Sequence, residues 1–162
     1  MNATDRLDAI AHAVEQAYAR VQRENMRDVP ILNPRLQVRM PGLRAWQDRA
    51  LGVLITPWCM NLLALPLPGR PAFDALPAGR TCPVDLPSGT YELLATHLPE
   101  LGHHLAGSLF SPMQDFGSQQ QALAAAQSAL DLLFAHPKPP DVVPSRRGFL
   151  FGSGAATQDA SA

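Results

Sequence analysis

Proline is the residue that most limits how this chain can fold, because 16 of its 162 residues are prolines. A proline has a fixed φ angle and no backbone N–H, so it interrupts helix interiors and central strands. The secondary-structure elements must therefore be mostly short and separated by stiff turns. A hydrophobic content of 46% is ordinary for a folded protein, and a chain of this length fits one domain around a single core.

Two segments have the spacing of amphipathic helices. Over residues 4–25, apolar side chains recur at steps of three and four, and Thr4 and Asp5 are candidate caps. Residues 118–136 begin with Ser118-Gln-Gln-Gln121, which has the spacing of a capping box. The apolar residues that follow fall on one helix face, which we expect to pack on a sheet: Leu123, Ala126, Leu130 and Leu133.

Between these helices, short apolar runs predict a mainly antiparallel sheet of four to five strands. Leu36–Met40 is a candidate edge strand, and residues 43–66 contain two adjacent strands. Pro87-Ser88-Gly89 has the chemistry of a tight turn within a hairpin, and residues 103–110 form a further strand. The aperiodic residues 66–81 indicate a loop. The chain is thus predicted to be α+β, with an N-terminal helix, this sheet, a C-terminal helix packed on the sheet and a proline-rich tail.

The domain should span residues 1–152. The small and polar residues 153–162 are expected to form a disordered tail.

The charge balance argues against several classes of partner. Thirteen basic and fourteen acidic residues give a net charge of −1, which provides no field to attract nucleic acid or anionic lipid. The apolar stretches are far shorter than the roughly 20 residues that span a bilayer. Because the N-terminal segment also lacks the continuous apolar stretch of a secretory signal, we expect a cytoplasmic protein in which Cys59 and Cys82 remain thiols.

No pattern of catalytic or metal-ligating residues stands out. Cys59, Ser108 and Ser111 lack the glycine-framed turn that exposes an activated nucleophile. The sequence has no Cys-x-x-Cys and no His-x-x-x-His, and the adjacent His103 and His104 should face opposite sides of a strand. We therefore expect one buried and one solvated histidine, and no catalytic residue, metal or cofactor.

Apolar and aromatic residues lie beside prolines in several predicted turns. Trp58 follows Thr-Pro, and Phe110, Pro112 and Met113 lie at the end of a predicted strand. Such residues usually close a core, but a set of them in turns can also form a peptide-binding surface. Trp58, Phe110, Pro112 and Met113 are therefore candidates for an apolar binding groove.

Arg146 and Arg147 form a second candidate site near the C-terminus. Ser145-Arg-Arg-Gly-Phe-Leu150 looks like a twin-arginine export motif, although such signals act at an N-terminus ahead of an apolar segment. The plain interpretation is a surface arginine pair. An alternative hypothesis is that Arg146–Gly152 imitates an export signal and occupies the groove until a binding partner displaces it.

Several short segments occur in a fixed order along most of the chain. They are Asn25–Pro34 with its Met-x-Asp and Leu-x-Pro elements, Gly52–Trp58, Leu86–Gly89, Leu105–Met113, and Pro140–Pro144 followed by Arg146–Gly152. Together, over roughly residues 12–152, they resemble the HybE-type [NiFe]-hydrogenase assembly chaperones, a family that includes the HupJ and HoxT maturation proteins. Some members carry a fused rubredoxin, which needs two Cys-x-x-Cys pairs that this chain lacks.

This resemblance implies a cytoplasmic chaperone that is not an enzyme and has no cofactor of its own. Its expected partner is the precursor of the hydrogenase small subunit, which carries iron–sulfur clusters and a twin-arginine signal and is held until it can be exported. The large subunit and other maturation proteins are further expected partners. The residues expected to contact such a client are Trp58, Phe110, Pro112, Met113, Arg146 and Arg147.

Two other functions remain open at the level of sequence. A metal-delivery or redox accessory protein of the same pathway would draw its ligands from Cys59, Cys82 and His103 or His104. An unrelated small hydrolase would depend on Ser111 or His97.

Overall fold

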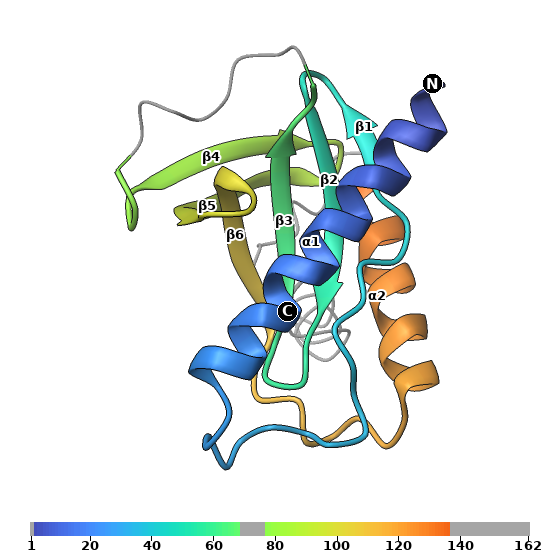
Figure 1. Cartoon of the computed structure of the whole chain (residues 1–162). Helices are drawn as coiled ribbons and strands as arrows, with labels where there is room; N and C mark the ends of the chain where they lie inside the picture. The colour runs from blue at the N-terminus through green and yellow to red at the C-terminus, as the bar shows by residue number, and fades with distance from the viewer. Residues whose placement is uncertain (1, 69–76, 137–162) are drawn as a thin grey trace, which may run out of the picture.

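A curled antiparallel sheet forms the centre of the computed structural model, which describes residues 2–68 and 77–136 (Figure 1). The six strands in this part of the chain are β1 (Arg44–Trp46), β2 (Arg49–Ile55), β3 (Met60–Pro66), β4 (Thr81–Leu86), β5 (Gly89–Leu98) and β6 (Gly102–Phe110). They lie in the order β1-β2-β3-β6-β5-β4, so β6 separates β3 from the β4–β5 hairpin. The predicted α+β fold is confirmed, with six strands where four to five are predicted from the sequence.

The additional strand arises in residues 43–66, which form β1, β2 and β3 rather than two strands. β1 and β2 are joined by a two-residue turn at Gln47 and Asp48, between the paired residues Trp46 and Arg49. Gln47 has a φ of 56°, the left-handed conformation that tight hairpin turns require. A turn without glycine or proline gives little signal in a sequence, and this explains why β1 is not predicted.

The segment Leu36–Met40, in contrast, does not form the predicted edge strand. Arg39 makes an isolated antiparallel bridge with Ile55, in which each N–H donates to the other carbonyl at 2.8–2.9 Å. On one side of this bridge, the N–H and the carbonyl of Gln37 bond the side chain of Gln119 at 2.9 and 3.3 Å. On the other side, Pro41 has no backbone N–H, so a longer hydrogen-bond ladder does not develop.

Helix α1 (Ala3–Asn25) crosses one face of the sheet over β2 and β3 (Figure 1). It is capped by Asn2, whose Oδ1 accepts a hydrogen bond from the N–H of Asp5 at 2.8 Å, so the cap precedes the predicted Thr4 or Asp5. Its buried face contributes Val14 to a small core with Met40, Leu54, Leu63 and Leu65. Within the described ranges, no helix combines the length and apolar character needed to cross a membrane.

Helix α2 (Gln119–Phe134) packs against β2 on the opposite face. Ser118 caps it by accepting a hydrogen bond from the N–H of Gln121 at 3.1 Å, as predicted. The Gln121 side chain accepts from the N–H of Gly117, one residue earlier than in a standard capping box. The buried positions of the helix are Ala122, Ala126, Leu130 and Leu133, and Leu123 is partly buried against the same core.

The sheet is therefore a middle layer between two helices. β2 and β3 are covered on both faces, and their side chains are buried almost throughout. On β5 buried and exposed side chains alternate, and Leu94 on the uncovered face is 50% exposed. The loops at the ends of such a rigid sheet are the places where functional residues are most often held.

Candidate interaction surface at one end of the sheet

Three loops meet at the end of the sheet that lies at the bottom of Figure 1. They are residues 26–39 after α1, residues 56–59 between β2 and β3, and residues 111–118 between β6 and α2. Because β2, β3 and β6 are neighbours in the sheet, the turn and the last loop emerge side by side. We call these three loops, together with Phe110 at the end of β6, the loop end.

Asn33 ties the three loops together from a buried position. Its backbone N–H donates to the carbonyl of Pro57 at 2.9 Å. Its side-chain Nδ2 donates to the carbonyls of Met113 at 2.9 Å and Phe116 at 2.8 Å, while Oδ1 accepts from the N–H of Arg35 at 3.0 Å. Because both ends of the amide have partners, its burial carries little penalty, and the loop end is held in one arrangement.

Thr56 closes the turn between β2 and β3. Its Oγ1 donates to the carbonyl of Cys59 at 2.8 Å and accepts from the N–H groups of Cys59 at 2.9 Å and Trp58 at 3.3 Å. The Pro57 ring beside it is buried, whereas Trp58 is partly exposed. The main role of the Thr-Pro-Trp segment is therefore to shape the turn. The indole of Trp58 is the part of it that other molecules can reach.

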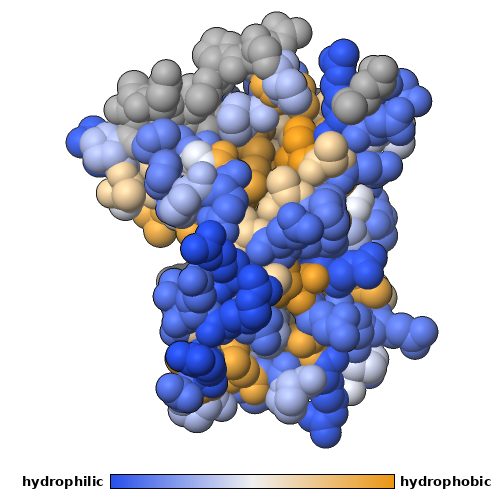
Figure 2. Space-filling model, viewed as in Figure 1, coloured by the Kyte–Doolittle hydropathy of each residue, from blue (hydrophilic) through white to orange (hydrophobic). Residues whose placement is uncertain are grey.

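Ile31 and Phe110 are large apolar side chains exposed at the loop end, to 44% and 39%. The ring of Phe110 packs edge-on against that of Phe116, with 5.8 Å between the ring centroids. The carbonyl of Ile31 accepts a hydrogen bond from the side-chain amide of Gln114, so the first loop lies against the third. Figure 2 shows apolar patches between hydrophilic side chains in this lower part of the molecule. Apolar exposure on adjoining loops is typical of a binding surface.

The predicted groove residues are not all accessible at this surface. Trp58 is partly exposed, and Phe110 and Pro112 are exposed. Met113 is fully buried in the main core among side chains of the sheet and α2, because the chain turns inward after Pro112. It therefore supports the loop end from beneath and does not line a groove.

Ile31 is a loop-end residue that the sequence did not indicate, because the short apolar stretch around it is interrupted by Pro30 and has no periodic signal. Its position between Pro30 and Leu32 gives no hint of exposure. Arg146 and Arg147 lie outside the described residues.

Cys59 is not arranged as a nucleophile. Burial raises the pKa of its thiol, and hydrogen bonds with Thr56 and Asn61 oppose this shift only in part. A raised pKa keeps the sulfur protonated near neutral pH, and the protonated thiol reacts poorly.

The residues considered for a hydrolase lie far apart. His97 pairs with His103 where β5 and β6 meet their connecting turn, whereas Ser111 follows the other end of β6. His103 and Phe110 are seven positions apart on that strand. At 3.3 Å per residue this is roughly 23 Å along the strand, too far for a Ser111–His97 dyad.

The ligands considered for a metal carrier are also dispersed. Cys59 lies in the β2–β3 turn and Cys82 on the edge strand β4, and both are free thiols. Among the described residues, no group of three or more His, Cys, Asp or Glu side chains could hold a metal ion.

His103 and His104 face opposite sides of β6, as predicted. His104 is fully buried, with Nδ1 3.0 Å from the carbonyl of Gly102 and Nε2 2.8 Å from the hydroxyl of Tyr18 on α1. A neutral ring that donates from Nδ1 and accepts the Tyr18 proton at Nε2 satisfies both bonds. Burial lowers the pKa of His104 and raises that of Tyr18 to about 12, so this contact between α1 and the sheet is uncharged near neutral pH.

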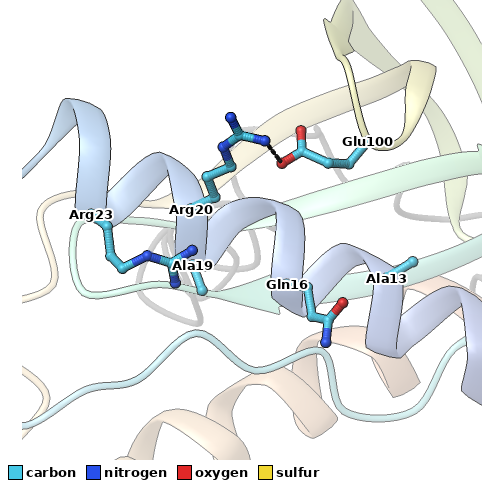
Figure 3. A pocket seen from close by; sticks show the side chains of 6 residues that line it. All are labelled: Ala13, Gln16, Ala19, Arg20, Arg23 and Glu100. Atoms are coloured by element: carbon cyan, nitrogen blue, oxygen red, sulfur yellow. Dashed lines mark hydrogen bonds and ion pairs between the residues drawn. The ribbon is translucent and has the colours of Figure 1, made fainter.

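A depression of about 460 Å³ lies between α1 and the β5–β6 turn (Figure 3). Arg20 reaches from the helix to Glu100 in the turn, with 3.1 Å between Nη1 and Oε2. The other lining residues are Ala13, Gln16, Ala19 and Arg23. Since both charged partners remain partly exposed, the ion pair contributes little stability, and the depression is polar and open.

Comparison with known proteins assigns the chain to a family. Residues 9–152 match a family model described as [NiFe]-hydrogenase assembly, chaperone, HybE. The chain belongs to this family. Over 138 residues, this HybE-family chain is 46% identical to hydrogenase expression/formation protein HoxT of Azotobacter vinelandii, covering 83% of this chain and 86% of that protein. It is 44% identical to hydrogenase expression/formation protein HupT of Azotobacter chroococcum over 138 residues, 84% and 90% of the two chains.

A solved structure supports the fold of this HybE-family chain. The solution structure of HybE from Escherichia coli aligns with a TM-score of 0.65 at 24% identity, covering 89% of this chain and 90% of that one. The arrangement of two helices around a curled antiparallel sheet is thus shared. The resemblance seen in the sequence motifs is confirmed.

Proposed function

We propose that this HybE-family chaperone binds a precursor of a [NiFe]-hydrogenase subunit through the loop end, and that it catalyses no reaction. The family supports the assembly role. The exposed side chains of Ile31 and Phe110 on a junction held by Asn33 carry the proposal that binding occurs here. A surface that is already ordered loses less conformational entropy when it binds, so apolar contacts made there translate better into affinity.

The proposed client is the small-subunit precursor, bound in the cytoplasm before export. A twin-arginine signal joins an arginine pair to an apolar segment of roughly 7–15 residues. The apolar side chains of Ile31, Trp58 and Phe110 suit such a segment better than they suit a charged one. Pro112 extends this surface, and Arg146 and Arg147 remain proposed contributors from the C-terminal segment.

The site is tested by replacing its exposed apolar side chains. We expect Phe110→Ser and Ile31→Ser each to weaken binding of the purified precursor by about tenfold or more, or about 1.4 kcal/mol, since aromatic and aliphatic anchors dominate such interfaces. Leu132→Ser on α2 and Leu94→Ser on β5 are matched controls, because these leucines are similarly exposed elsewhere, at 54% and 50%. The affinity of each variant for the precursor is measured with the precursor immobilised on a surface. Equal binding by all four variants contradicts the proposed site.

The client is tested with three purified ligands: the small-subunit precursor, the same subunit without its signal region, and the large-subunit precursor. The proposal expects the strongest binding to the first and a clear loss for the second. Preferential binding of the large-subunit precursor would retain the assembly role and overturn the choice of client.

A further inference from the structure

His97 and His103 form a side-chain pair outside the proposed client surface. They are directly opposite each other on β5 and β6, next to the turn that joins these strands. Their ring centroids are 4.7 Å apart, and the ring planes are inclined at 58°. His104 points to the other face and bonds Tyr18, so it is not part of the pair.

The ring of His103 contains a buried atom without a partner. Among the buried side-chain nitrogen and oxygen atoms in the described part of the chain, Nδ1 of His103 is the one that makes no hydrogen bond. Leaving a buried polar nitrogen unsatisfied costs about 1–3 kcal/mol, so native proteins rarely retain one without a reason. The neighbouring exposed imidazole of His97 gives such a nitrogen a natural companion ligand.

We propose that His97 and His103 together bind a divalent late transition-metal ion of the kind that imidazole prefers, such as Ni²⁺, Cu²⁺ or Zn²⁺. A metal–nitrogen bond of about 2.0–2.1 Å places the ion roughly 3.2 Å from each ring centroid. With one nitrogen of each ring directed at a shared ion, centroids 4.7 Å apart would subtend an angle of about 95° at that ion. This lies close to the right angle of adjacent ligands in octahedral and square-planar complexes, which Ni²⁺ and Cu²⁺ favour.

The number of protein ligands determines how firmly the ion is held. The described residues supply no third side chain to complete a three-ligand group. Water must fill the remaining positions, so the ion exchanges with solution and is not a resident cofactor. The site also differs from the ligand set predicted from sequence, because it uses His97 in place of Cys59 or Cys82.

Metal binding should stabilise the β5–β6 turn and leave the loop end unchanged. An ion held by one residue of each strand fastens the hairpin where Glu100 pairs with Arg20 of α1. Since the two imidazoles are brought together only by the β5–β6 pairing, the ion binds the folded chain more tightly than the unfolded one and raises the melting temperature. Phe110 lies at the opposite end of β6, so the site is independent of the proposed client surface.

Calorimetric titration of the untagged full chain with Ni²⁺ and with Zn²⁺ tests the site. We expect one ion per chain in the micromolar range, together with a rise in melting temperature. His97→Gln and His103→Gln should each abolish both effects, whereas His12→Gln should preserve them. Cu²⁺ added below equimolar amounts should broaden the NMR signals of His97 and His103 before those of His12 and His136.

The exposed position of His97 makes its variant the decisive one, because its loss should not disturb folding even if that of His103 does. Unchanged metal binding in His97→Gln would overturn the proposal. So would an absence of stoichiometric binding by the native chain, or Cu²⁺ broadening centred on His12 or His136.

Discussion

Asn33 shows how a single buried amide organises the candidate surface. An amide suits the position because Nδ2 provides two donors for two carbonyls while Oδ1 accepts a backbone N–H. A carboxylate in its place would face the same carbonyls with no proton to donate. The residue lies in a proline-rich segment without periodicity, so its sequence context gives no sign of this role.

Replacing Asn33 by alanine should lower the free energy of unfolding by about 2–3 kcal/mol, because the carbonyls of Met113 and Phe116 lose their donors in a buried setting. Urea denaturation measures the change. Asn25→Ala, at the exposed end of α1, is the matched control and should stay within about 0.5 kcal/mol of the native chain. A loss for Asn33→Ala as small as this control would mean that the loops are held together by other contacts.

The Tyr18–His104 contact predicts a pH dependence of stability. Because burial lowers the pKa of His104 from its ordinary 6.5, the unfolded chain binds a proton more readily than the folded one. This contribution is complete above about pH 6.5 and is lost as the pH falls below it. The raised pKa of Tyr18, about 12, gives a second loss as the pH rises above its ordinary 10.0.

Unfolding by urea at several pH values between about 7.5 and 5.5 tests the acid side. We expect the native chain and His12→Gln to lose stability over this range, and His104→Gln to lose distinctly less. Parallel pH profiles for all three proteins would show that His104 is not the group responsible.

Among the elements, the helices are where sequence and structure agree best. α1 and α2 begin and end within two residues of their predicted limits, because a period of three to four and a cap are local signals. The strands agree less well, since β1 depends on a turn at Gln47 and the segment Leu36–Met40 is limited to one bridge. Whether such a segment becomes a strand depends on the strand it pairs with. The residue pattern of the segment alone does not identify that partner.

Removing the N-terminal cap of α2 should weaken that helix. Ser118→Ala should destabilise the chain by about 1 kcal/mol, because the N–H of Gln121 loses its acceptor. Ser128→Ala, at an exposed position within the same helix, should be neutral or slightly stabilising since alanine is the better helix former. Thermal or urea unfolding compares the two. Equal effects would indicate that α2 is held by its packing on β2 alone.

At the scale of the whole molecule, strand register determines which functional residues meet. Trp58, Phe110 and Pro112 do reach one end of the sheet, as their positions beside predicted strand ends suggest. Met113 does not reach the surface, because the direction in which a loop side chain points is set by tertiary packing. The pairing of His97 with His103 likewise follows from the β5–β6 register, whereas the sequence draws attention to the adjacent and divergent His103-His104.

The hydrogen bonds made by Asn33 also determine when, during synthesis of the chain, the loop end can form. Its side chain bonds residues that lie 80 and 83 positions further along the chain. A chain still being synthesised displays Ile31 long before Phe110, Met113 and Phe116 exist, at rates of roughly 5–20 residues per second. The loop end therefore cannot form in a growing chain that has not yet reached Phe116, and such a chain cannot use it to bind another protein.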